Sequence, residues 1–169
     1  NISDLGLLES KKWESEILSE WKVGESSSIK IMRSFFENGI QDYSEGRNFP
    51  IKKNVSRLSP YLHWGQISPN TLWYELNNLK NVKEKDIEVF KSELGWREFA
   101  YYLLYHFPYL QKKNLKTNFD NFQWLDDQKN FKKWSMGVTG IPIVDAGMRE
   151  LWQTGYMHNR PRMIVSSFL

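Results

Sequence analysis

Apolar residues recur at helical spacing along most of the chain. The run over residues 3–21 places them on one face, opposite charged positions: Leu7, Leu8, Trp13, Ile17, Leu18 and Trp21. The next segment repeats this spacing at Ile31, Met32, Phe35 and Phe36, after three serines at 26–28 that are suited to cap a helix. Alternation typical of strands is weak throughout, so the pattern predicts one all-α domain.

Proline and serine predict where the later helices begin and end. Residues 41–57 break the periodicity, which indicates a loop. Ser68 and Pro69 are typical of an N-cap and a first helical residue. The longest helix is expected over about residues 86–107, and a shorter one includes residues 131–134. Four tryptophans lie on apolar stripes and are assigned to packing: Trp13, Trp21, Trp73 and Trp134.

The segment 139–163 combines an apolar stripe with many polar side chains. Gly155 stands where a C-cap glycine would follow the stripe, which consists of Ile143, Ala146 and Leu151. Asp145 and Arg149 are four residues apart, which places them to pair along one helical face. This segment therefore predicts a helix that ends at a glycine.

Three side chains after this glycine share one helical face. Asn159, Arg162 and Met163 have offsets of zero, three and four, and we expect their helix to begin near Arg160 with Pro161 in its first turn. An amide, a guanidinium and a thioether on one face suit the wall of a pocket for a large polar-aromatic ligand. The alternative is a helix that ends in a solvated basic turn.

Two other stretches carry candidate binding chemistry. Residues 56–59 bring two serine hydroxyls and Arg57 to a predicted helix start, which suits an anion such as phosphate. The alternative there is an ordinary N-cap with a surface arginine. Glu93, Trp96 and Arg97 share a helical face that suits a flat ligand with a polar edge. The alternative is a surface Glu–Arg pair beside a core tryptophan.

Composition excludes several classes of function. The chain has no Cys, so disulfides and thiolate chemistry are impossible, and its His residues lack metal-ligand spacing. Dinucleotide and phosphate-loop glycine motifs are missing, and no Ser/His/acid order supports a hydrolase. No apolar run approaches the roughly 18 residues of a membrane span, and we expect a cytoplasmic protein. A net charge of +3 permits a nucleic-acid partner without requiring one.

Five stretches, in this order and spacing, resemble the helical FAD-binding domain of the DNA photolyase and cryptochrome family. They are YSEGRNFP (43–50), SRLSPYLHWGQISP (56–69), ELGWREF (93–99), TGIPIVDAGMREL (139–151) and MHNRPRM (157–163). The resemblance implies that residues 1–169 form part of this multi-helical domain. The N-terminal α/β antenna domain and the C-terminal remainder of the flavin pocket are expected to be absent, as in a fragment.

The resemblance implies a noncovalent FAD and a set of contacts to it. The adenine-nucleotide and phosphate side is matched by Tyr43, Ser56, Arg57, Leu58, Ser59 and Arg97. Asn159 matches a residue that faces the flavin ring, and Arg162 matches an arginine beside the flavin. Val55 stands where a threonine is usual, which removes one hydroxyl donor.

The resemblance also implies the substrate. Asn159 and Met163 are not histidines, which favours repair of cyclobutane pyrimidine dimers by a class I photolyase over repair of (6-4) photoproducts. Glu93, Trp96 and Met163 match residues that contact the flipped-out dimer in damaged DNA. Arg160 would bind a DNA phosphate. A cryptochrome photoreceptor module is the alternative.

Two further expectations follow from the resemblance. Trp124 matches the outermost tryptophan of the family's electron chain, although an apolar neighbourhood would also explain an indole there. The chain alone is expected to bind FAD weakly or not at all, to be an inert helical fragment in that case, and to self-associate through apolar surface. The sequence leaves the antenna pigment unknown.

Overall fold

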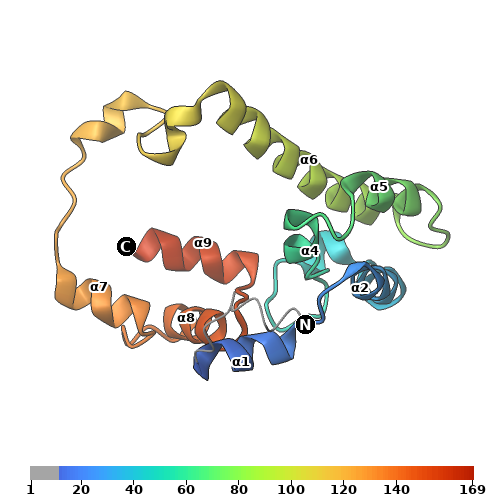
Figure 1. The fold of residues 1–169 in the computed structure, drawn as a ribbon, viewed down its shortest axis with the longest axis horizontal. Coiled ribbons are helices and arrows are strands. Elements are labelled where there is room, and N and C mark those ends of the chain that lie inside the picture. Colours follow the sequence, from blue (N-terminus) through green and yellow to red (C-terminus); the bar gives the residue numbers. More distant parts are fainter. Residues whose placement is uncertain (1–11) are drawn as a thin grey trace, which may run out of the picture. The chain divides into compact units, whose positions relative to one another are not determined.

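A computed structural model describes residues 12–169, with side chains from residue 14 onward. The described chain is helical and contains no strand (Figure 1). Its α-helices are α1 (Lys12–Glu20), α2 (Glu25–Asn38), α3 (Tyr43–Gly46), α4 (Ser59–His63), α5 (Pro69–Asn77), α6 (Glu84–His106), α7 (Gln128–Ser135), α8 (Pro142–Thr154) and α9 (Asn159–Phe168). Two short 3-10 helices, η2 (Pro108–Gln111) and η3 (Thr117–Asn121), lie between α6 and α7. The all-α prediction is confirmed.

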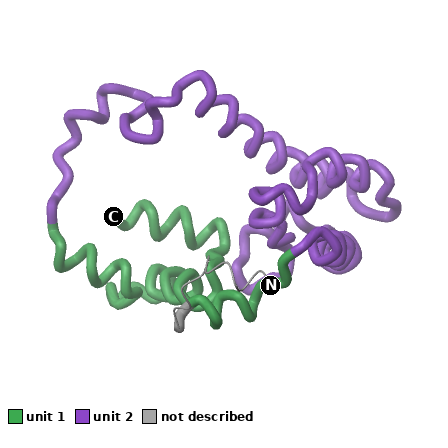
Figure 2. Tube along the Cα trace, viewed as in Figure 1, with its two compact units in different colours: residues 1–23, 127–169 green, residues 24–126 purple. Residues whose placement is uncertain are grey.

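The chain divides into two compact units (Figure 2). Unit 1 combines residues 1–23 with residues 127–169, and unit 2 contains residues 24–126. Unit 1 therefore contains α1 and α7–α9, whereas unit 2 contains α2–α6 and both 3-10 helices. The predicted stripe residues Leu7 and Leu8 lie outside the described part of the chain, as does the side chain of Trp13.

An aromatic cluster forms much of the core of unit 2. Phe35 of α2, Tyr43 of α3 and Phe90 of α6 are all buried, and their ring centroids lie 5.1–5.7 Å apart. Aromatic pairs at such separations add stabilisation beyond the area they bury. The cluster therefore joins α6 to α2 and α3, which lie much earlier in the sequence.

Helix α5 begins as predicted, but its tryptophan does not belong to the core. The Ser68 hydroxyl accepts the Thr71 N–H at 3.0 Å, and Pro69 is the first helical residue. Leu72 and Leu76 are 0% exposed, whereas Trp73 is 46% exposed with the Lys91 ammonium 4.9 Å from its ring centre. One residue along a helix turns the side chain by about 100°, which carries Trp73 off the buried stripe.

Helix α2 begins before the serines that were expected to cap it. Its N-cap is Gly24, with φ of 115°, a conformation that favours glycine. The serines at 26–28 lie inside the first turn, and the Ser28 hydroxyl donates to the carbonyls of Glu25 and Gln66. The predicted loop over 41–57 also contains α3, a single helical turn that the sequence pattern did not predict.

The buried face of α8 differs from the predicted stripe. Val144, Gly147 and Met148 are buried, whereas the predicted positions are exposed: Ile143, Ala146 and Leu151. A Cβ on Gly147 would lie 3.2 Å from a methyl of Val165 in α9, so glycine permits close approach of the two helices. Packing against α9 thus buries the face of α8 that contains Gly147, which is shifted by one residue from the predicted apolar stripe.

Two tryptophans pack within unit 1, as predicted. The indole of Trp134 donates to the Val165 carbonyl at 3.0 Å and packs against the buried cluster. The indole of Trp21 donates to the Thr154 carbonyl at 2.7 Å, which fastens the end of α1 to α8. Gly155 adopts φ of 68° after α8, which confirms the predicted C-cap.

Asp145 organises the turn before α8 and does not form the predicted pair with Arg149. Its carboxylate accepts the Thr139 hydroxyl and N–H at 2.6 and 2.7 Å and the Gly140 N–H at 2.9 Å. These hydrogen bonds, led by the Thr139 hydroxyl, hold the pKa of Asp145 below its usual value, and the charge of Arg149 adds to this effect. The Arg149 guanidinium itself donates to the Gly137 carbonyl at 3.0 Å.

Neither a membrane span nor a metal cluster occurs among the described residues. None of the described helices has the length and apolar character needed to cross a bilayer. Groups of three or more His, Asp or Glu suited to hold a metal ion are also missing from this part of the chain.

The turn at Asp145 predicts a dependence of stability on pH. A carboxylate whose pKa is lower in the folded state stabilises the fold above its unfolded pKa of about 4, and this contribution is lost as pH falls through the folded value. We expect Asp145→Asn to lower the thermal midpoint at neutral pH and to weaken its fall in acid. Circular dichroism melts at a series of pH values measure both effects. Asp120→Asn, on an exposed 3-10 helix, is the control, and equal acid sensitivity of the two variants would contradict the prediction.

Candidate functional site

Glu93 of α6 forms an ion pair with Arg47, a residue that was not among the site residues predicted from the sequence. Its carboxylate accepts from the Arg47 guanidinium at 2.6 Å, and neither side chain is fully exposed. The same guanidinium lies 5.4 Å from the ring centre of Tyr43. Burial lowers the pKa of Arg47, but the hydrogen bond to Glu93 and the nearby Tyr43 and Glu93 outweigh it, so the pKa is raised. Arg47 stands within the YSEGRNFP motif, which was the only signal that could have identified it.

Arg97 does not pair with Glu93, although the two are four residues apart. It donates instead to the Leu62 carbonyl at 3.0 Å and to the Tyr101 hydroxyl at 3.1 Å. Because Leu62 lies in α4, Arg97 links α6 to the short helix at the proposed phosphate side. The alternative interpretation of a surface Glu–Arg pair is wrong for these two residues.

Trp96 presents its indole to the surface of unit 2 and does not belong to the core. It is 64% exposed, and its nearest ring partner is Phe99 on the same helix, at 5.7 Å between centroids. Leu94, two residues earlier, is buried and holds the opposite side of α6 in place. An exposed indole next to an anchored carboxylate is suited to stack on a flat ligand and bond its edge.

The hydroxyl-rich stretch before α4 has features of an anion site. Arg57 adopts φ of 53°, a left-handed conformation, and the Ser56 hydroxyl accepts the Leu58 N–H at 3.3 Å. Within the described chain, no side chain caps the start of α4, where Ser59 is the first residue. Leu58, which follows Arg57, and Tyr43 are both buried in the same unit. This stretch fits a phosphate group because it offers hydroxyl donors, a guanidinium and an uncapped helix start. A phosphate site here is what the resemblance to FAD-binding proteins implied.

The start of α9 presents three of the predicted side chains on one exposed face. The helix begins at Asn159 after the N-cap His158, whose Nδ1 accepts the Arg160 N–H at 3.1 Å. Pro161 lies in the first turn and is buried together with Val165. Asn159, Arg162 and Met163 are exposed on the other side. The expected helix start is therefore confirmed to within one residue.

Two arginines of α9 make contacts that restrict their side chains. Arg160 donates to the thioether sulfur of Met163 at 3.4 Å, so the predicted phosphate-binding and dimer-binding residues touch each other. Arg162 donates to the Met157 carbonyl at 3.1 Å, within the turn that precedes the helix. Both contacts are local to unit 1.

Trp124 lies in the extended segment between η3 and α7. It is 74% exposed, and its ring centroid lies 4.7 Å from that of Phe122. High exposure suits a residue that takes an electron from a reductant dissolved in the solvent. The contact with Phe122 is also what the alternative explanation, an apolar neighbourhood, would give.

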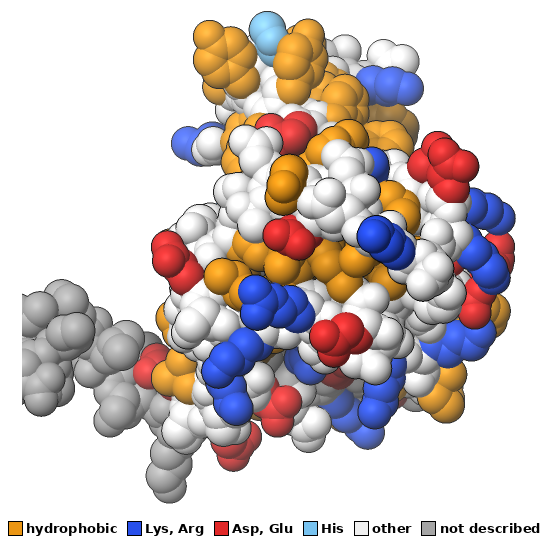
Figure 3. Space-filling model, turned by 90° about the vertical axis from the view of Figure 1, so that its right-hand side faces the viewer, with side chains coloured by type: hydrophobic (Ala, Val, Ile, Leu, Met, Phe, Trp, Pro, Cys, Tyr) orange, Lys and Arg blue, Asp and Glu red, His pale blue; other side chains and the backbone are white. Residues whose placement is uncertain are grey.

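Each unit therefore contains some of the predicted site residues. Unit 2 contains the carboxylate, the exposed indole and the anion-binding stretch. Unit 1 contains the amide, guanidinium and thioether face of α9. The face of the molecule drawn in Figure 3 mixes basic and acidic side chains with apolar ones and shows no single-sign field, as the small net charge would suggest.

Comparisons with known proteins give a consistent result. Residues 90–169 match the sequence profile of the family described as the FAD binding domain of DNA photolyase. The deoxyribodipyrimidine photo-lyase of Agrobacterium fabrum is 47% identical over 170 residues, which cover 99% of this chain and 36% of that protein. Cryptochrome-2 of Arabidopsis thaliana is 37% identical over 180 residues, covering 99% of this chain and 29% of that protein.

A solved structure agrees with these sequence matches. The crystal structure of a bacterial class III photolyase from Agrobacterium tumefaciens is 47% identical and superimposes with a TM-score of 0.95, over 100% of this chain and 36% of the other. That structure is described as a class III photolyase, whereas the resemblance in the sequence had pointed to class I. The chain spans about a third of the length of these relatives. This chain belongs to the DNA photolyase and cryptochrome family and corresponds to part of its helical FAD-binding domain.

Proposed function

We propose that this chain is part of a deoxyribodipyrimidine photolyase, which splits cyclobutane pyrimidine dimers in DNA by light-driven electron transfer from reduced FAD. The observation that carries the proposal is the ion pair between Glu93 and Arg47 beside the exposed indole of Trp96. An oriented carboxylate and a free aromatic face are what a flipped-out pyrimidine pair requires for recognition. The 47% identity to the photo-lyase of Agrobacterium fabrum supports the same reading.

The residues around α4 fit the nucleotide side of FAD. Ser56, Arg57 and Ser59 hold the phosphates through hydroxyl, guanidinium and helix-start N–H donors. Tyr43 and Leu58 line the adenine-nucleotide side, and Arg97 serves the phosphate side from α6. From α9, Asn159 and Arg162 contribute to the flavin side. When bound and reduced, FAD supplies the light-absorbing electron donor for repair.

Four residues take the substrate in this proposal. Trp96 stacks on the dimer, Glu93 accepts a hydrogen bond from the base edge, and Met163 packs against the pyrimidine rings. Arg47 holds the Glu93 carboxylate in one orientation, so that little reorganisation is needed when the dimer binds. Arg160 binds a phosphate of the DNA backbone, which positions the strand without reading its sequence.

Trp124 serves electron transfer in the proposal. Its 74% exposure would give an electron donor dissolved in the solvent access to an oxidised indole, as the outermost member of an electron chain requires.

A cryptochrome module is the second candidate function. It is favoured by the 37% identity to Cryptochrome-2 of Arabidopsis thaliana over almost the whole chain. Light-dependent repair distinguishes the two candidates. Restoration of a thymine-dimer oligonucleotide by the illuminated full-length protein supports the photolyase, whereas a bound flavin with no repair supports the photoreceptor.

Variants of the substrate face test the photolyase proposal. Trp96→Ala removes a stacking platform worth about 1–3 kcal/mol per base, so we expect dimer DNA to bind roughly ten- to a hundredfold more weakly. Glu93→Gln keeps the shape of the side chain but removes its charge, and we expect roughly tenfold weaker binding and slower repair. Fluorescence anisotropy in the dark and repair per absorbed photon measure these effects.

Matched controls lie in the same unit. Trp73→Ala removes another exposed indole, and Glu98→Gln another exposed carboxylate on α6, both outside the proposed substrate face. Each control is expected to bind dimer DNA as the unchanged protein does. Equal losses in the control and site variants would show that these positions act only on stability.

The isolated chain 1–169 is proposed to bind FAD weakly and to self-associate. Large apolar side chains are exposed along the second half of α6, including Tyr101, Tyr102 and Tyr105. Apolar surface of this kind favours association between copies. We expect added FAD to keep its free fluorescence and the chain to elute from gel filtration above its mass of 20.2 kDa. A stoichiometric, tightly held flavin on a monomer would refute both expectations.

A further inference from the structure

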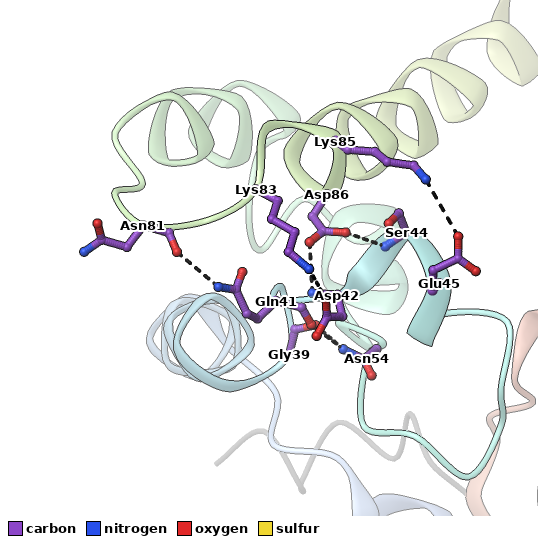
Figure 4. Close-up of polar contacts among 10 residues, drawn as sticks. All are labelled: Gly39, Gln41, Asp42, Ser44, Glu45, Asn54, Asn81, Lys83, Lys85 and Asp86. Carbon is purple, nitrogen blue, oxygen red and sulfur yellow. Dashed lines mark hydrogen bonds and ion pairs between the residues drawn. The ribbon is translucent and has the colours of Figure 1, made fainter.

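The beginning of α6 holds the short helix α3 through one buried carboxylate (Figure 4). Asp86 is 0% exposed, and its two oxygens accept the N–H groups of Asp42 at 2.9 Å and Ser44 at 2.8 Å. These two N–H groups lie on either side of Tyr43, the first residue of α3. A single side chain therefore fixes the backbone before and after Tyr43.

The backbone held in this way includes a strained residue. Asp42 adopts φ of 58°, a left-handed conformation that costs free energy in residues other than glycine. Asn54 supports the preceding residues by donating to the carbonyls of Gly39 and Gln41 at 2.9 and 2.8 Å. The ion pairs Lys83–Asp42 and Lys85–Glu45 nearby are exposed, and such pairs contribute little. Asp86 is thus the contact that holds the backbone N–H groups at the start of α3, beside the packing of the Tyr43 ring.

The charge of Asp86 is kept by its hydrogen bonds. Burial alone raises the pKa of a carboxyl group, but the Ser44 N–H and hydroxyl, the Asp42 N–H and the charge of Lys83 together lower the pKa of Asp86. An uncharged amide could not replace this arrangement, because its NH2 group would stand where one carboxylate oxygen accepts an N–H group, so that two donors would face each other.

The short helix connects Asp86 to the substrate face. Tyr43 packs against Phe90, and Arg47 directly follows α3, lies over the Tyr43 ring and donates to Glu93. Asp86 and Glu93 are seven residues apart on α6, which is about two turns or 10 Å. One helix therefore contacts the α3 segment at both ends, with a buried carboxylate at one end and the dimer-binding carboxylate at the other.

We propose that Asp86 is a positioning residue for substrate recognition: by fixing the start of α3 it places Arg47, and through Arg47 it orients the Glu93 carboxylate toward the dimer. This inference rests on the photolyase function proposed above. A positioning role differs from a merely structural one in its effect on DNA binding. The effect of Asp86 passes through the Arg47–Glu93 ion pair and disappears when that ion pair is removed.

A double-mutant cycle in the full-length protein tests the inference. Asp86→Asn, which keeps the volume but loses one acceptor, is expected to weaken binding of a thymine-dimer oligonucleotide roughly three- to tenfold at a temperature where the protein is folded. In the Glu93→Gln background the same change is expected to have no further effect, because residues acting through one contact are not additive. Anisotropy in the dark measures all four affinities.

The matched control is Asp145→Asn, which removes another carboxylate that holds a backbone turn, in unit 1. It is expected to lower stability without weakening dimer binding. If Asp86→Asn does not fold, Asp42→Gly is added to both arms of the cycle, because glycine adopts the left-handed conformation without strain.

The outcomes separate the two proposals. If the unchanged protein binds no dimer DNA, the proposed function fails and the inference fails with it. If it binds dimer DNA, three results overturn only the positioning role. Asp86→Asn could keep full affinity, or it could lose no more affinity than Asp145→Asn does. In the third result, the double variant loses affinity by the product of the two single losses, Asp86→Asn and Glu93→Gln. A loss confined to proteins that retain Glu93 supports it.

Discussion

Buried carboxylates that accept backbone N–H groups set the local chain path in both units. Asp86 in unit 2 fixes the start of α3, and Asp145 in unit 1 closes the turn that leads into α8. A carboxylate removed from water is costly unless hydrogen bonds replace those to water, so each of these side chains is tied to one arrangement of the backbone. Because the bonds run to the main chain, they direct whole helices and not only single side chains.

The helices that follow these turns divide their surfaces between packing and chemistry. In α9, Pro161 and Val165 are buried, and Val165 approaches α8 closely because Gly147 has no side chain. Asn159, Arg162 and Met163 are left exposed by the same rotation of the helix. In α6, burial of Phe90 and Leu94 leaves the Trp96 indole outward. The functional groups are therefore available because other positions of the same helices are occupied by the core.

Local patterns in the sequence predicted that the chain is helical, and they predicted many of the helix ends. The cap at Ser68, the glycine at 155 and the start of α9 depend on backbone preferences within a few residues, and they were predictable for that reason. Which face is buried was less predictable. Trp73 and the expected stripe on α8 were misplaced because a turn of about 100° per residue lets packing choose between neighbouring faces. The single-turn helix α3 was missed because its stability comes from Asp86, more than 40 residues away.

The sequence by itself determined the chemical groups of the candidate site, since motifs preserve residue types and spacing, and it determined the helical class. Only the tertiary structure decided how those groups are paired. Glu93 had a plausible partner four residues away in Arg97, yet it bonds Arg47, 46 residues earlier, while Arg97 holds Leu62. Spacing along a helix shows which side chains could meet. The partner is chosen by whichever group the fold brings nearer with better hydrogen-bond geometry, and that choice depends on contacts distant in the chain.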